Sequence, residues 1–163
     1  MRFIITSLLI FSFFFNVGFS QTKLPNSYVN VGLGLGMNYG VLGTKTVIGY
    51  RNSGIMIGLG SVSGGLFGYE IGGQISKEWF YANIGYGVFG WQQINNNPKE
   101  TVEAGDILIG AMLGMGQAKR VFIDIGLGHT FGAQTRKDFL GNSISLDSFN
   151  LVLGIGFRLG TKE

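Results

Sequence analysis

Apolar side chains alternate with glycine or polar side chains along most of this chain, most clearly in residues 106–131. In the first half of this segment one face carries Ile107, Ile109, Ala111, Leu113 and Met115. In the second half one face carries Val121, Ile123, Ile125 and Leu127. Because successive side chains of a strand point to opposite faces, each half predicts a β-strand. Only residues 117–120 separate them, so the segment predicts a β-hairpin.

The residues on the second face of this hairpin indicate whether the apolar face meets a protein core or lipid. It is rich in glycine, and Asp124 and Thr130 are polar members. A strand of a soluble sheet usually places long polar side chains on its solvated face. A transmembrane barrel instead turns its apolar face to lipid and its small and polar face to a narrow lumen. The pattern therefore predicts a transmembrane β-barrel.

The same alternation predicts six further strands, at residues 28–39, 44–50, 55–60, 67–75, 80–92 and 149–159. In these strands we expect Met37, Tyr39 and Val88 to face outward. The connections at residues 51–54, 76–78 and 117–120 are short, whereas those at 93–105 and 132–147 are long. Short periplasmic turns and longer outer loops are typical of outer-membrane barrels. We predict an all-β fold, an eight-stranded up-and-down antiparallel transmembrane β-barrel.

Aromatic residues cluster near the predicted strand ends, as the interfacial girdles of membrane barrels require. They are Tyr28, Tyr39, Tyr50, Tyr69, Trp79, Trp91, Phe131 and Phe149.

The first 20 residues have the layout of a secretory signal peptide. Arg2 is followed by an apolar run over residues 3–15, and Gly18 and Ser20 place small residues before Gln21. We predict cleavage between Ser20 and Gln21, with residues 21–163 forming the barrel domain in the cell outer membrane. A retained membrane helix is the alternative.

Composition narrows the classes of function. The 163 residues include 29 glycines, no cysteine and one histidine. The absence of cysteine excludes disulfides, thiol catalysis and a lipid-anchored amino-terminal cysteine. The net charge of +3 comes without any basic run, so nucleic-acid binding has no support. We expect no cofactor, no metal and no identified small-molecule substrate; the expected partners are outer-membrane lipid and other outer-membrane proteins.

Few charged side chains fall on the predicted inward face. Glu70 is one candidate lumenal charge, and Asp124 and Arg158 are two others, with Lys45 and Arg51 left open. Asp124 lies near the start of its strand and Arg158 near the end of the next, so antiparallel pairing places them at similar height. Because buried charges need partners, we predict a lumenal ion pair between Asp124 and Arg158. A proton or ion pathway is the alternative.

Over residues 28–159 this pattern resembles the small eight-stranded outer-membrane barrels of the OmpA/OmpX type, especially glycine-rich versions from Bacteroidetes-type Gram-negative bacteria. The resemblance concerns the architecture of the barrel. The role we expect is structural or interaction-based, including that of an accessory subunit in a larger outer-membrane complex. A narrow, porin-like channel is the second class. A soluble, lipocalin-like barrel is a further alternative.

A lipid A-modifying enzyme is the third class of function considered. His129 is the candidate catalytic base for such an enzyme. In the lipid A deacylase pattern a serine follows the histidine by two residues, but Phe131 stands there. Thr130 faces the other side of the strand, and Asp138 and Asp147 have no defined geometry relative to the histidine. Residues 85–90 match GxGxxG but lie inside a predicted strand without a following helix, so they do not predict dinucleotide binding. We therefore expect no enzymatic activity.

Overall fold

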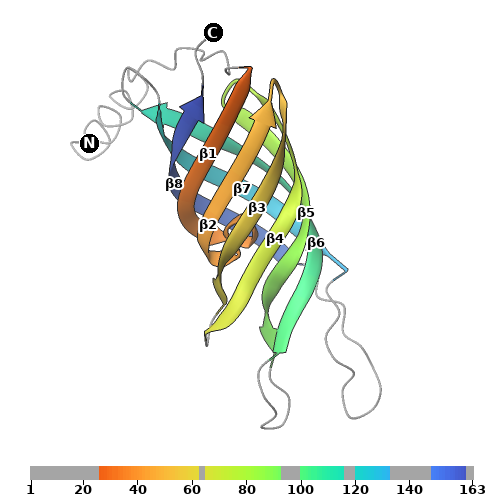
Figure 1. Cartoon of the computed structure of the whole chain (residues 1–163). Helices are drawn as coiled ribbons and strands as arrows, with labels where there is room; N and C mark the ends of the chain where they lie inside the picture. The colour runs from red at the N-terminus through yellow and green to blue at the C-terminus, as the bar shows by residue number, and fades with distance from the viewer. Residues whose placement is uncertain (1–25, 63–64, 93–99, 116–119, 133–147, 161–163) are drawn as a thin grey trace, which may run out of the picture.

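A computed structural model of the protein is a closed barrel of eight antiparallel strands, in which every strand pairs with its sequence neighbours and β8 closes on β1 (Figure 1). The structure describes residues 26–62, 65–92, 100–115, 120–132 and 148–160. The strands are β1 (Ser27–Gly36), β2 (Val41–Tyr50), β3 (Ser53–Val62), β4 (Leu66–Lys77), β5 (Phe80–Gln92), β6 (Glu100–Met115), β7 (Val121–Phe131) and β8 (Ser148–Gly160). The predicted all-β, eight-stranded antiparallel barrel is confirmed.

The strand register fixes the tilt and width of the barrel. Stepping from Met115 across each paired residue in turn, once around the barrel, returns to β6 at Gly105, ten residues away. Eight strands with this stagger tilt by about 40° and enclose an interior just wide enough for side chains. β1 begins and β8 ends at the end of the barrel where β2 turns into β3 (top of Figure 1), here called the turn end; the opposite end is the loop end.

Large apolar side chains cover the outer wall of the barrel on every strand, as the alternation predicted. They include Leu33, Ile48, Ile57, Ile71, Ile84, Ile109, Leu127 and Leu153. The opposite phase of each strand points inward and carries most of the glycines and the buried polar residues.

The predicted outward orientation of Met37 and Tyr39 is wrong. β1 ends at Gly36, and Met37–Tyr39 form a 3-10 helix, η1, whose side chains are buried in the interior. Gly36 and Gly40 flank η1 with φ angles of 113° and 61°, a backbone conformation that favours glycine. These two glycines allow the chain to leave the wall, fold inward and return as β2.

One other predicted orientation and one predicted girdle position are wrong. Val88 is buried, because the pairing of β5 with β6 shifts register between Val88 and Gly90 and a bulge reverses the alternation there. Tyr28 also points inward and is 2% exposed, so it belongs to no outer girdle. By contrast Tyr50, Trp79, Trp91, Phe131 and Phe149 are exposed near strand ends.

The predicted long loop over residues 93–105 is shorter than expected, because Glu100 to Gly105 already belong to β6. The predicted signal peptide and most of the second long loop lie outside the described residues. No helix within the described ranges is long and apolar enough to cross a membrane.

Candidate functional site

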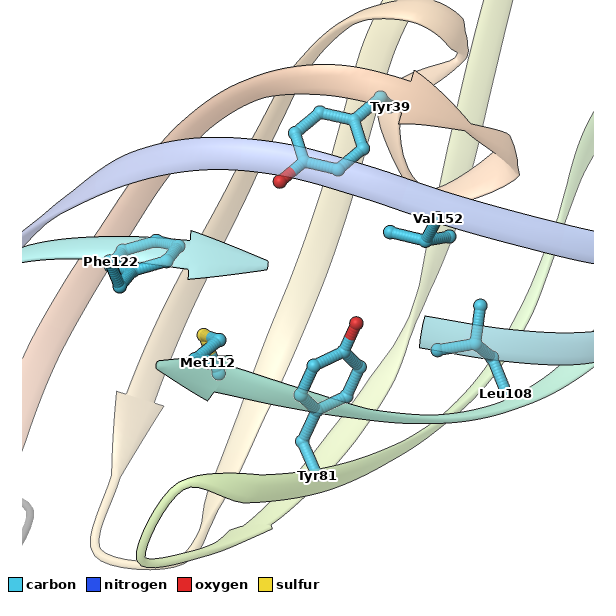
Figure 2. Close-up of a cluster of buried hydrophobic side chains, with 6 residues drawn as sticks. All are labelled: Tyr39, Tyr81, Leu108, Met112, Phe122 and Val152. Carbon is cyan, nitrogen blue, oxygen red and sulfur yellow. The ribbon is translucent and has the colours of Figure 1, made fainter. Parts of the chain in front are cut away.

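Side chains close the interior at its middle. Figure 2 shows six buried residues that converge there from η1, β5, β6, β7 and β8. They are Tyr39, Tyr81, Leu108, Met112, Phe122 and Val152. In an eight-stranded barrel such a set is enough to fill the cross-section. The interior of this barrel is a packed core at this level.

Asp124 lies at the centre of the polar network inside this core. Its Oδ2 accepts hydrogen bonds from Lys45 Nζ at 2.6 Å and from the Tyr39 hydroxyl at 2.9 Å. Its Oδ1 accepts one from the Tyr81 hydroxyl at 2.6 Å. The side chains of Lys45 and Asp124 are 2% and 0% exposed, so the ion pair is fully desolvated. Three donors satisfy the carboxylate, as a buried charge requires.

Lys45 is held by aromatic rings as well as by the carboxylate. Its ammonium lies 4.5 Å from the centre of the Tyr81 ring and 5.5 Å from that of Tyr39. Such cation–π contacts strengthen when water is excluded. Lys45, Tyr39, Tyr81 and Asp124 therefore form one buried unit, here called the Asp124 cluster, which ties β2, η1, β5 and β7 together across the interior.

Inward glycines make room for this cluster. A Cβ atom on Gly154 would lie only 2.1 Å from the Tyr39 hydroxyl oxygen, and one on Gly34 would lie 2.9 Å from the Tyr39 ring. Both positions face the ring from the wall of the barrel. Part of the glycine excess thus lets an aromatic side chain lie flat against the inner wall.

The predicted ion pair between Asp124 and Arg158 is replaced by the pair between Asp124 and Lys45. Asp124 is opposite Gly154 in the β7–β8 register, four residues from Arg158. Arg158 instead donates from Nε to Asn30 Oδ1 at 3.0 Å, and its guanidinium lies 6.0 Å from the centre of the Phe122 ring. Arg158 is half-buried and lines a cleft of about 1450 Å³ at the turn end.

Two more carboxyl groups are buried on the loop-end side of the Asp124 cluster. Glu70 on β4 is the candidate lumenal charge of the sequence analysis, and it is 1% exposed. Asp106 on β6 is 0% exposed and was not singled out from the sequence. None of their four carboxyl oxygens makes a hydrogen bond of normal geometry with the described residues.

His129, the residue considered for the enzyme alternative, lies on the outer wall. His129 is exposed and makes an edge contact with Phe149, with ring centres 6.0 Å apart. Thr130 points to the interior and is buried, so the two side chains lie on opposite faces of β7. Asp138 and Asp147 lie outside the described residues. The described residues place neither a hydroxyl nor a carboxylate hydrogen bond on His129.

A second polar cluster lies on the outer wall toward the loop end. Glu103 accepts hydrogen bonds from the hydroxyls of Tyr69, at 2.7 Å, and Tyr86, at 2.9 Å. Phe67 stacks with Tyr69 at a ring separation of 6.5 Å. This arrangement joins β4, β5 and β6 outside the barrel.

No group of three or more histidine, aspartate or glutamate side chains among the described residues is arranged to hold a metal ion. Comparisons with protein-family models, curated proteins and solved structures give no significant match.

Proposed function

We propose that this protein is an integral outer-membrane barrel with a structural or interaction role and a closed interior. The observation that carries the proposal is the inversion of the fold, with polar and charged groups inside and large apolar side chains outside. On β8 alone Leu151, Leu153, Ile155, Phe157 and Leu159 are exposed. Monomeric soluble proteins rarely expose contiguous apolar surface on this scale.

The height of the apolar wall supports the same proposal. Phe149 to Leu159 cover ten residue steps of β8, which at about 3.3 Å per residue and a tilt of about 40° amount to a height of about 25 Å. The apolar band of outer-membrane barrels is about 25 Å tall. Tyr50 and Trp79 toward the turn end, and Phe131 and Phe149 toward the loop end, are exposed where interfacial girdles belong.

The packed interior favours a structural or interaction role over a narrow channel. The Asp124 cluster and its apolar neighbours fill the cross-section at mid-height. Ions would have to displace a desolvated ion pair to pass. We therefore propose that the barrel serves through its outer wall and its loop end, including as an accessory subunit of a larger outer-membrane assembly.

Insertion and conductance test the two parts of this proposal separately. Protein refolded into lipid vesicles should be protected from protease over the strands and should give no reproducible conductance steps in planar bilayers. Reproducible steps would move the function to a channel. Recovery of the folded barrel in the soluble periplasmic fraction would refute a membrane role altogether.

The interaction role has its own measurement, the size of the native protein after gentle detergent extraction. Co-migration with larger outer-membrane proteins at a fixed ratio is the expected result for an accessory subunit. A single small species would leave a stand-alone structural barrel.

A further inference from the structure

The strand register brings the two unpartnered carboxyl groups together. On β5 Gly85 is opposite Asp106 of β6, and Gly87 is opposite Glu70 of β4. These two glycines place no side chain between the neighbouring strands. A Cβ atom on Gly85 would lie 2.5 Å from Glu70 Oε1 and 2.9 Å from Asp106 Oδ1, so these two oxygens are at most 5.4 Å apart. The two carboxyl groups are therefore direct neighbours in the interior.

Among the described residues, the surrounding interior offers no free cation to either group. Lys45 is the buried cation on this side of the core, and its ammonium is bonded to Asp124. The buried or half-buried charged side chains of the described barrel are three carboxyl groups, on Glu70, Asp106 and Asp124, and two cations, Lys45 and Arg158. Counted over these described residues, the interior lacks one positive charge when every carboxyl group is ionised.

We propose that the folded barrel holds one proton between Glu70 and Asp106, and that the loss of this proton at alkaline pH loosens the loop-end half of the interior. Two adjacent buried carboxylates cannot both carry charge at low cost, and a shared proton turns their repulsion into a hydrogen bond. The same proton supplies the missing positive charge.

Several neighbouring groups are also polar or titratable, and the pair must be considered among them. Charged or titratable side chains face the interior from β1, β2, η1, β5, β7 and β8; they are Tyr28, Lys45, Tyr39, Tyr81, Asp124 and Arg158. Asn150 of β8 is buried as well, and its side-chain nitrogen has no hydrogen-bond partner among the described residues. β3 contributes no inward titratable residue. None of these groups is a carboxyl other than Asp124, which already has three donors.

The link to η1 explains why the loop-end half should respond. The backbone carbonyl oxygen of Asn38 lies 2.5 Å from the position of a Cβ on Gly58, and Gly58 is paired with Glu70. η1 therefore packs beside the carboxyl pair. The Asn38 side chain is itself buried without a hydrogen-bond partner. A second negative charge at this place would draw in water where η1 now packs.

The pH dependence of unfolding tests the proposal. An unfolded chain has already ionised both carboxyls near neutral pH, so unfolding releases the bound proton. The unfolding equilibrium constant of the wild type should then rise by up to tenfold per pH unit as pH increases above neutrality, so that stability is lost toward high pH. Glu70→Gln should remove this slope, because the amide can donate to Asp106 without titrating.

The matched control is Glu103→Gln, which removes a carboxyl on the outer wall and should keep the wild-type slope. The exposed His129 is present in all variants and cancels in the comparison. An unchanged slope in Glu70→Gln would overturn the proposal. The proposal would also be overturned if the pH slope of the wild type disappeared when the same pH series was measured with added calcium. The missing positive charge would then be a metal ion.

An infrared measurement keeps the proposal testable if Glu70→Gln does not fold. The folded wild type at neutral pH should show the absorption band of a protonated carboxyl group, and the band should disappear at alkaline pH. A barrel that is folded at neutral pH and lacks this band would contradict the shared proton.

Discussion

Replacing Lys45 by methionine is the most direct perturbation of the packed interior. Methionine retains most of the length and apolar volume of the lysine stem, so the change isolates the charge. Lys45→Met would leave Asp124 ionised, fully buried and bonded only to the hydroxyls of Tyr39 and Tyr81. We expect the barrel to fold and to be markedly less stable.

The distance gives the size of the effect. Opposite charges 2.6 Å apart attract by about 6 kcal/mol at an effective dielectric constant of about 20, and the cost of removing both charges from water offsets much of this. Removing one partner of a buried pair typically costs about 3–5 kcal/mol, because the other charge stays buried. We expect Lys45→Met to lower the free energy of unfolding by this amount.

The control is Arg158→Met, which changes the residue that was predicted from the sequence to form an ion pair with Asp124. Arg158 is half-buried and donates to a neutral amide, so its loss should cost about 1 kcal/mol. Urea unfolding in detergent micelles, followed by tryptophan fluorescence and by the heat-dependent gel mobility of folded barrels, measures both variants. The reasoning is refuted if Lys45→Met costs no more than Arg158→Met.

Three further changes test packing, hydrogen bonding and the outer wall. Gly154→Ala should destabilise the barrel by about 1–3 kcal/mol, because its methyl group would meet the buried phenol of Tyr39. Its control, Gly73→Ala, has open space around it and should change the free energy of unfolding by no more than about 0.5 kcal/mol. Tyr81→Phe removes a donor from a buried carboxylate and should cost about 1–3 kcal/mol in urea unfolding. Leu153→Lys, in the middle of the apolar band, should cost about 2–4 kcal/mol for unfolding from lipid vesicles, and Leu159→Lys, at its edge, about 0–1 kcal/mol. Equal costs at the two positions would contradict a membrane around the barrel.

The sequence predicts well which strand residues face inward and which face outward, because this depends only on the local alternation of apolar with small or polar residues. Inside and outside are set by a period of two residues, and most strands keep that period without interruption. Val88 and Tyr39 were misassigned where the period breaks, at a bulge and at a 3-10 helix. The glycines on either side of η1 were the available signal for the second break.

The contents of the interior are harder to predict, because they depend on contacts between strands that are not neighbours. Lys45 and Asp124 meet across the barrel, from β2 and β7, and no pattern along the chain encodes that distance. The pairing of Asp124 with Arg158 assumed a register in which the two residues lie level, and the actual register separates them by four residues. Asp106, by contrast, shares the phase of the inward Leu108, so its inward position could have been predicted.

Cysteine accessibility at the outer wall tests the central claim, that lipid surrounds this barrel. The chain has no cysteine, so Leu153→Cys introduces a single thiol in the middle of the apolar wall, and Thr101→Cys introduces one on the outward phase beyond it. In outer membranes a water-soluble maleimide should label the thiol at position 101 and leave that at position 153 unmodified until the protein is denatured. Rapid labelling of both positions in the folded, membrane-associated protein would contradict the account.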